Sequence, residues 1–262
     1  MAAIEKHAPG EFCWPELGTT DTAGAKVFYG QLFGWTPEDL PIGEGMTYTM
    51  LKLEGREAGA LYELNPDQRQ QGIPPHWMTY VAVESADQTA ARARELGANV
   101  LTEPFDVFDA GRMSVMLDPQ GATFAVWQAK HHIGLRINGV PGALTWSELA
   151  TTDAGKARQF YTGLFGWGTK IGDAGGIEYT EWLNQGQPVG GMLQMTEEWK
   201  GAPPHWMPYF LVADCDASAA RASQLGGQVI VPPTNIPHAG RFAMVQDPQG
   251  AMFSIIRLTA QH

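Results

Sequence analysis

An internal repeat constrains this 262-residue chain more than any other feature of its sequence. The run Trp-Pro-Glu-Leu at 14–17 returns as Trp-Ser-Glu-Leu at 146–149, and Pro-Pro-His-Trp-Met at 74–78 returns unchanged at 203–207. Each copy therefore carries one Glu and one His at corresponding places. A pattern that recurs after about 130 residues predicts two similar domains, each long enough to bury a core of its own.

We expect the two domains to span residues 1–136 and 137–262. The segment between Lys130 and Pro141 is rich in Gly and polar residues and has no clear hydrophobic period, as is typical of a linker. The domain boundary should therefore lie close to residue 137.

Each repeat reads as two successive units in which a strand is followed by a helix and then by further strands. The first helix should follow Thr-Thr-Asp at 19–21, whose side-chain oxygens can cap it, and end at Gly34. The first unit is predicted to hold a strand over 12–17, a helix over 22–33 and a hairpin over 48–53 and 58–64, with one further strand nearby. The second unit follows a polar connector at 65–72 and is predicted to hold a strand over 76–83, a helix over 86–96 and strands over 100–101, 114–117 and 122–128.

Composition and charge limit the partners of the chain. With 44% hydrophobic residues, 31 Gly and 18 Pro, the sequence is that of a globular, turn-rich protein. A net charge of −11 disfavours nucleic-acid backbones and anionic membranes, which attract basic surfaces. A small neutral or aromatic ligand fits this charge better, and we expect a monomer or a homodimer.

Cysteine usage and the amino terminus bear on location. Cys13 and Cys215 occupy unrelated places in the two repeats, and neither belongs to a CxxC pair, so a disulfide framework or a zinc–thiolate site is not expected. Residues 1–7 hold no apolar segment typical of a signal peptide, and no stretch is as long as a membrane span. These features predict a soluble, cytoplasmic protein.

Several short motifs, which recur with small changes in the second half, carry a family resemblance. They are Thr-Thr-Asp at 19–21, Phe-Tyr at 28–29 with Leu-Phe-Gly-Trp at 32–35, Leu-Gly-Ala at 96–98, Gly-Arg at 111–112 and the turn Asp-Pro-Gln-Gly at 118–121. On these motifs the chain resembles the vicinal oxygen chelate superfamily, which includes glyoxalase I, extradiol dioxygenases and bleomycin-resistance proteins, over nearly its whole length. The resemblance implies an α+β fold of tandem glyoxalase-like domains. Each domain would consist of two βαβββ modules whose curved sheets form a half-open barrel around one cavity.

The resemblance also implies a divalent metal held by His and Glu side chains on particular strands. In this sequence those positions fall on Trp14, Met78, Gly59 or Ala60, and Ala125 in the first half, and on Trp146, Met207, Gly190 or Gly191, and Ser254 in the second. None of the usual ligands is in place, and a zinc-type site normally needs at least three protein ligands. We therefore predict no metal ligand and leave the cofactor unknown.

One Glu and one His per repeat are the candidate catalytic residues. Strand alternation places each of them on the same face as a vacated metal position two residues away. If the two strands pair antiparallel with these vacated positions opposite each other, Glu16 faces His76 and Glu148 faces His205. Such a carboxylate would raise the pKa of the imidazole or fix its tautomer for acid–base work. The alternative is that each pair is structural or lies at the cavity rim.

Six further residues are candidates for substrate contact. The two arginines among them follow Gly and would suit an anionic ligand at the cavity mouth, although each is alternatively a structural partner for a nearby Asp. The aromatic and sulfur side chains would suit a flat ligand. The candidates are Trp14, Met78, Arg112, Trp146, Met207 and Arg241.

Two classes of function stay open, an enzyme of glyoxalase-like or hydroxylase/dioxygenase-like type and a sequestering binder in the manner of bleomycin-resistance proteins. The vacated metal positions favour a metal-independent enzyme or a ligand binder with one apolar cavity per domain. The alternative is a metal-dependent lyase, hydroxylase or dioxygenase that uses a displaced Glu/His site. A third possibility is an interaction protein that uses the fold as a scaffold.

Overall fold

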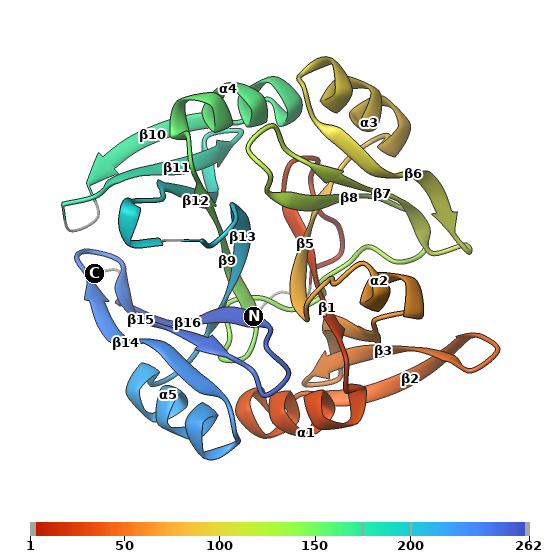
Figure 1. Ribbon diagram of the computed structural model, residues 1–262, viewed down its shortest axis with the longest axis vertical. Helices are drawn as coiled ribbons and strands as arrows, with labels where there is room; N and C mark the ends of the chain where they lie inside the picture. Colours follow the sequence, from red (N-terminus) through yellow and green to blue (C-terminus); the bar gives the residue numbers. More distant parts are fainter. Residues whose placement is uncertain (1–3, 174–175, 200, 260–262) are drawn as a thin grey trace.

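The computed structural model describes residues 4–173, 176–199 and 201–259. Within these residues each half of the chain forms one eight-stranded sheet (Figure 1). The elements of the first half are β1 (Phe12–Thr19), α1 (Thr22–Phe33), β2 (Thr36–Gly43), β3 (Met46–Leu53), β4 (Arg56–Glu63), α2 (Pro66–Gln70), β5 (His76–Ala82), α3 (Ala86–Glu95), β6 (Asn99–Val107), β7 (Gly111–Leu117) and β8 (Thr123–Ala129). Those of the second half are β9 (Leu144–Thr151), α4 (Ala154–Phe165), β10 (Gly168–Asp173), β11 (Glu178–Asn184), β12 (Gln187–Gln194), the 3₁₀ turn η1 (Glu197–Trp199), β13 (His205–Leu211), α5 (Cys215–Gln224), β14 (Gln228–Ile236), β15 (Gly240–Gln246) and β16 (Met252–Leu258).

In both sheets two βαβββ modules join through their first strands. The strand orders are β2-β3-β4-β1-β5-β8-β7-β6 and β10-β11-β12-β9-β13-β16-β15-β14. At the centre β1 runs antiparallel to β5, and each of them pairs in parallel with the last strand of its own module. Each sheet curls into a half-open barrel, and the two barrels open toward opposite sides of the molecule (Figure 1). The predicted α+β fold of tandem modules is confirmed, while the exact domain boundary, between β8 and β9, stays a prediction.

The first helix of each half is fixed by its two ends, as the sequence predicts. Asp21 accepts a hydrogen bond from the backbone N–H of Gly24 and so caps α1. Gly34 adopts the left-handed conformation, with φ 75°, and its N–H bonds to a carbonyl of the last turn. In the second half Asp153 and Gly166 cap α4 in the same way.

The sequence pattern does not locate two elements of the first half. All residues of the edge strand β2 are exposed, and its Thr-Pro-Glu-Asp-Leu-Pro run shows no apolar alternation. The connector predicted at 65–72 contains α2. Asn65 and Gln68 cap the amino-terminal end of this helix by forming a capping box. Both elements are set by hydrogen bonding rather than by burial, so hydrophobic periodicity does not reveal them.

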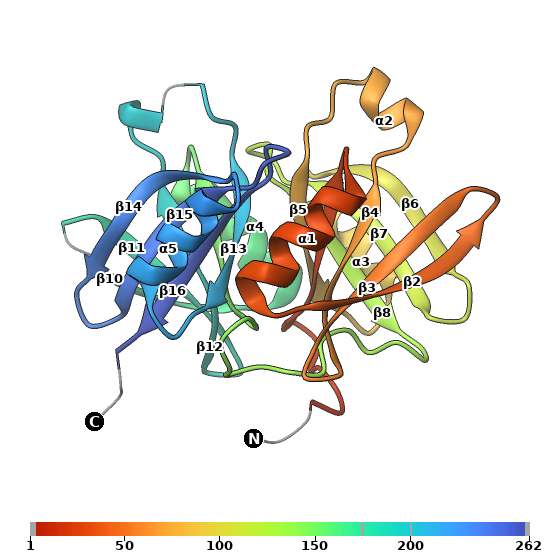
Figure 2. The same ribbon diagram turned by 90° about the horizontal axis from the view of Figure 1, so that it is seen from below.

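The four longer helices lie on the convex faces of the sheets, and these faces pack against each other. As a result α1 lies beside α5 and α4 beside α3 (Figures 1 and 2). The ring of Phe33 in α1 packs 5.1 Å from Phe210 in β13, and Phe28 packs 6.3 Å from Phe253 in β16. Each hydrophobic core is therefore built from helices and strands of both halves. No helix in the described part of the chain is long and apolar enough to cross a membrane.

Candidate functional site

Alternate residues of β1 and β5 line the first concave face. The register pairs Glu16 with Met78, and Gly18 with His76. The predicted pairing of Glu16 with His76 is therefore wrong by two residues. A shift of two residues leaves every side chain on its predicted face, so the hydrophobic pattern alone does not exclude it.

The second concave face repeats this register. Glu148 pairs with Met207, and His205 pairs with Ala150, so the predicted couple of Glu148 with His205 is wrong as well. In both halves the Glu and the His are instead diagonal neighbours on one face. The geometry of antiparallel sheets separates the Cα atoms of such residues by roughly 7–8 Å. A ligand lying across this diagonal can reach both side chains.

Glu16 is held by two tyrosines rather than by a histidine. The hydroxyl of Tyr48 in β3 donates a hydrogen bond of 2.7 Å to one carboxyl oxygen of Glu16. The hydroxyl of Tyr80 in β5 donates one of 2.8 Å to the other. The Nε1–H of Trp14 donates to the Tyr48 hydroxyl at 3.0 Å. We call these four residues the first Glu–Tyr cluster.

The second half builds the same network, which we call the second Glu–Tyr cluster. Tyr179 of β11 donates to Glu148 at 2.7 Å, and Tyr209 of β13 donates to its other carboxyl oxygen at 2.6 Å. The Nε1–H of Trp146 donates to the Tyr179 hydroxyl at 2.8 Å. Four side chains are thus arranged identically on both concave faces.

Burial changes the pKa of both carboxyl groups. Desolvation raises the pKa of Glu16 and of Glu148, and the tyrosine hydrogen bonds partly oppose this shift because they stabilise the carboxylate. Each Glu residue nevertheless keeps some exposed surface. Such a group accepts hydrogen bonds when ionised and donates one when protonated.

The two candidate histidines lie at the starts of β5 and β13. Nδ1 of His76 lies 2.8 Å from the carbonyl oxygen of Pro74, and Nδ1 of His205 lies 2.9 Å from that of Pro203. Because a carbonyl oxygen only accepts, Nδ1 carries the proton and Nε2 of the neutral ring is an acceptor. Burial lowers the pKa of both histidines, which favours this neutral form.

The structure places Arg112 and Arg241 away from the concave faces. Arg112 of β7 forms an ion pair of 2.7 Å with Asp87 at the start of α3, and Arg241 of β15 forms one of 2.6 Å with Asp216 at the start of α5. Their guanidinium groups therefore lie on the convex side, beside the helices. The predicted location at the cavity mouth is wrong, and the contacts match the alternative of a structural partner for a nearby Asp.

The other predicted substrate contacts, Trp14, Met78, Trp146 and Met207, lie on the concave strands beside the two clusters. Their contact with a substrate stays a prediction. Among the residues that the structure describes, no group of three or more His, Cys, Asp or Glu side chains is placed to hold a metal ion. Trp, Met and Tyr around a single Glu do not fit a divalent ion, which normally takes at least three protein ligands. We therefore assign no chemical step to a metal.

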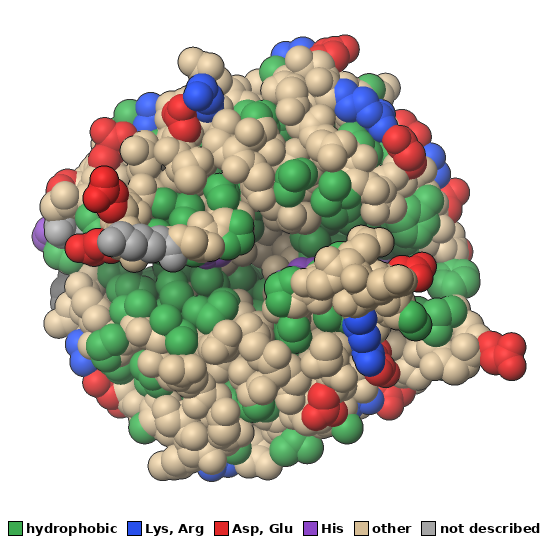
Figure 3. Space-filling model, in the orientation of Figure 1, with side chains coloured by type: hydrophobic (Ala, Val, Ile, Leu, Met, Phe, Trp, Pro, Cys, Tyr) green, Lys and Arg blue, Asp and Glu red, His purple; other side chains and the backbone are tan. Residues whose placement is uncertain are grey.

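Figure 3 shows a hollow with apolar side chains in the second half. The central and carboxyl-terminal strands of this half carry an apolar cluster. It consists of the buried Met207, Tyr209 and Ile256 with the partly buried Trp146, Phe242, Met244 and Met252. The second Glu–Tyr cluster therefore lies among apolar walls, as the polar groups of small-molecule sites commonly do.

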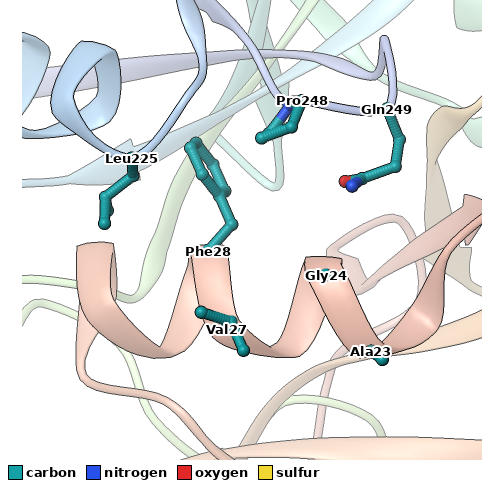
Figure 4. A pocket seen from close by; sticks show the side chains of 7 residues that line it. All are labelled: Ala23, Gly24, Val27, Phe28, Leu225, Pro248 and Gln249. Atoms are coloured by element: carbon teal, nitrogen blue, oxygen red, sulfur yellow. The ribbon is translucent and has the colours of Figure 1, made fainter.

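A further hollow of about 440 Å³ lies where the two halves meet, between α1, the end of α5 and a turn (Figure 4). It is lined by Ala23, Gly24, Val27, Phe28, Leu225, Pro248 and Gln249. These side chains offer no titratable group. The hollow belongs to the contact between the halves, and we assign it no function.

The sequence pattern singles out the Glu and His residues of the site but not its tyrosines. Tyr48 and Tyr179 recur at matching places in the two repeats, as do Tyr80 and Tyr209. This recurrence is the sequence signal that could have identified the tyrosines as candidates. It does not show where the hydroxyl groups point, because their target is set by neighbouring strands.

The arrangement of two βαβββ modules per half agrees with a comparison against family models. A model described as the Glyoxalase/Bleomycin resistance protein/Dioxygenase superfamily matches residues 12–126 and 142–255. The chain belongs to this superfamily. Because one match falls in each half, the resemblance drawn from the repeated motifs is confirmed for a tandem member.

Curated relatives of this superfamily member span its whole length. A Mycobacterium tuberculosis protein named CFP32, provisionally described as a glyoxylase, is 40% identical over 263 residues and is aligned over 100% of both chains. The anthracycline biosynthesis protein DauV of Streptomyces sp. strain C5 is 36% identical over 265 residues, which cover 97% of this chain and 96% of DauV.

Solved structures with the same fold include a Mn(II)-bound glyoxalase and a 2,3-dioxygenase. The Mn(II)-bound glyoxalase from Novosphingobium aromaticivorans has a TM-score of 0.65 at 18% identity, covering 95% of this chain and 82% of that one. The 2,3-dioxygenase LapB from Pseudomonas sp. KL28 has a TM-score of 0.65 at 12% identity, covering 99% and 94%. At these identities the likeness shows a common fold alone.

Proposed function

We propose that this protein binds a flat, largely apolar small molecule in the hollow of the second concave face, with Glu148 as the polar anchor. The observation that carries the proposal is the second Glu–Tyr cluster, in which a carboxyl group of raised pKa lies on a partly open apolar face. Apolar walls supply the binding free energy at such a site, and a few polar groups set the orientation of the ligand.

The chemistry of the cluster favours a ligand with a hydroxyl or carbonyl group. Each carboxyl oxygen of Glu148 accepts one tyrosine hydroxyl and keeps a second acceptor direction for a ligand hydroxyl. In its protonated form the same group donates to a carbonyl oxygen. Similarity to a protein of anthracycline biosynthesis supports a fused aromatic ring system that bears such oxygen atoms.

Calorimetric titration with 1,8-dihydroxyanthraquinone tests this proposal. We expect Glu148→Gln to weaken binding about tenfold or more, since it removes the carboxyl group that anchors the ligand. Glu178→Gln is the matched control, because Glu178 is an exposed residue of the same sheet that pairs with Arg158. Absence of binding to the wild-type protein, or equal affinity of both variants, would contradict the proposal.

The same face supports a second candidate, the enolisation of a bound ketone. The observation that favours it is the tautomer of His205 set by the Pro203 carbonyl, which leaves Nε2 as the acceptor nitrogen on the diagonal from Glu148. Nε2 would take a proton from the carbon beside the ketone, while the protonated carboxyl group donates to the ketone oxygen and so stabilises the enol. A relative described as a glyoxylase is consistent with chemistry on carbonyl compounds.

Deuterium exchange into 1-tetralone, followed by NMR in D₂O, tests this second candidate. We expect exchange at the carbon beside the ketone to exceed the buffer rate and to fall back to it in His205→Asn. Asn keeps a donor for the carbonyl of Pro203 but lacks the basic nitrogen. Exchange at the buffer rate in the wild-type protein would leave binding as the supported function.

A further inference from the structure

The two Glu–Tyr clusters match in geometry but differ in what covers them. Trp14 is only 4% exposed, whereas Trp146 keeps exposed surface. The imidazole of His132 packs edge-on against Trp14, with ring centroids 4.6 Å apart and planes at 86°, and lies 5.9 Å from Trp127. Among the described residues of the second half, Ile256 takes the strand position that Trp127 holds in the first. An aromatic ring from the linker thus occupies the first concave face.

The linker that carries His132 is firmly attached to the first sheet. The carbonyl oxygen of His132 accepts the Nε1–H of Trp127 at 2.8 Å, and the N–H of Leu135 donates to the carbonyl of Cys13 at 2.8 Å. Gly134 has φ 102°, and a Cβ added there would lie 2.2 Å from the Cys13 oxygen, so the backbone approaches as closely as only Gly allows. Figure 2 shows this segment crossing on the side opposite α2. These backbone contacts therefore fix the position of the His132 ring.

A helix attaches to the opposite end of the first concave face. Tyr62 of β4 lies there, and its hydroxyl accepts a hydrogen bond of 3.4 Å from Gln68 of α2. The corresponding position of β12 in the second half holds Leu193, which has no polar group to tie down a covering helix. Figure 2 shows α2 projecting above the first half and η1 (Glu197–Trp199) above the second.

We propose that His132 is a built-in occupant of the first concave face, which closes that site and leaves one ligand site per chain, in the second half. The imidazole takes the place of a flat ligand against Trp14. Its buried Nε2 has no hydrogen-bond partner among the residues that the structure describes, which indicates a ring held by packing. This inference rests on the proposed function for the identity of the open site, but the closure of the first site can be tested without a ligand.

Titration of the full-length protein with 1,8-dihydroxyanthraquinone gives the first test. We expect one ligand per chain, an affinity that falls about tenfold or more in Glu148→Gln and stays within about twofold in Glu16→Gln. His132→Ala should bind two ligands per chain, and His132→Phe, which keeps a ring against Trp14, should bind one. Two ligands on the wild-type protein, or a loss caused by Glu16→Gln instead, would overturn the inference while leaving ligand binding itself intact.

A ligand-free measurement separates this inference from the proposed function. In protein labelled with 5-fluorotryptophan, the ¹⁹F signals of Trp14 and Trp146 can be assigned with the variants Trp14→Phe and Trp146→Phe. We expect a soluble gadolinium chelate to broaden the Trp146 signal and spare that of Trp14 in the wild-type protein and in His132→Phe. In His132→Ala both signals should broaden. Broadening of Trp14 in the wild-type protein, or its shielding in His132→Ala, would refute closure by His132 even if the probe ligand does not bind at all.

Discussion

The hydroxyl group of Tyr29 in α1 donates a hydrogen bond of 2.8 Å to Asp247 in the other half of the chain. The same hydroxyl accepts the Nε1–H of Trp77 at 3.0 Å. Asp247 in turn accepts the backbone N–H groups of its own Asp-Pro-Gln-Gly turn through its other oxygen. A buried chain of hydrogen bonds therefore runs from a strand of the first concave face into a turn of the second half, and Tyr161 with Asp118 forms its counterpart at 2.9 Å.

Removal of either tyrosine hydroxyl should destabilise the protein without changing its fold. Tyr29→Phe leaves the buried indole N–H of Trp77 without an acceptor, so we expect the free energy of unfolding to fall by about 1–3 kcal/mol in urea titrations. Tyr161→Phe should act alike through Trp206, and the two losses should add because the sites share no partner. Tyr62→Phe, at a partly exposed hydroxyl, is the control and should cost less. Wild-type stability in both buried variants would contradict this account.

Neither half should fold by itself. The fragment 1–136 would expose Phe28 and Phe33, which pack against Phe210 and Phe253 in the intact chain. We expect fragment 1–136 to lack a cooperative thermal transition and dispersed amide signals in NMR spectra, and an equimolar mixture with fragment 137–262 to recover both. A monomeric fragment 1–136 with a dispersed spectrum would show that the shared cores are dispensable.

Loss of one tyrosine donor should raise the pKa of the neighbouring carboxyl group further. Hydrogen bonds from Tyr209 and Tyr179 lower the pKa of Glu148 and so oppose the larger effect of burial. In Tyr209→Phe, ¹³C NMR of the carboxyl carbon should therefore show a higher titration midpoint than in the wild-type protein. Tyr80→Phe should do the same for Glu16. An unchanged midpoint would mean that the hydroxyl does not stabilise the carboxylate.

Acidification should destabilise the protein through its buried histidines. Burial lowers the pKa of His76 and His205 below the ordinary value of 6.5, so the unfolded chain binds more protons than the folded one below that pH. Their contribution to stability is present above about pH 6.5 and is lost as the pH falls through the folded-state pKa. The double variant His76→Asn/His205→Asn should accordingly show a smaller drop in melting temperature between pH 7 and pH 5.

The raised pKa values of Glu16 and Glu148 act in the opposite direction in both proteins, so the comparison isolates the histidines. An equal drop in melting temperature in the wild-type protein and the double variant would refute this assignment.

Much of the fold could be predicted because its signals are local. The cap at Asp21, the left-handed Gly34 and the apolar spacing between them fix α1 without any tertiary information. The internal repeat then indicates that whatever one half builds, the other half builds too. The edge strand β2 escaped this reasoning because its exposed residues carry no burial pattern.

The site was only half predictable for a related reason. Strand alternation correctly placed Glu16 and His76 on one face, but it does not choose between registers that differ by two residues. The predicted Glu–His couple therefore gave way to a Glu held by two tyrosines and a His held by a proline carbonyl. For Arg112 the residue type suggested an anionic ligand, but the ion pair with Asp87 depends on which helix covers that strand.

The sequence by itself determined the superfamily, the tandem βαβββ modules and the residues that face each side of the sheets, because short-range periodicity and capping encode them. Only the tertiary structure decided which strands lie in which register, that each core is shared between the halves, and that the His132 ring packs against Trp14. These outcomes depend on contacts between residues far apart in the chain. A pattern with a period of two residues states which way a side chain points but not what it meets there.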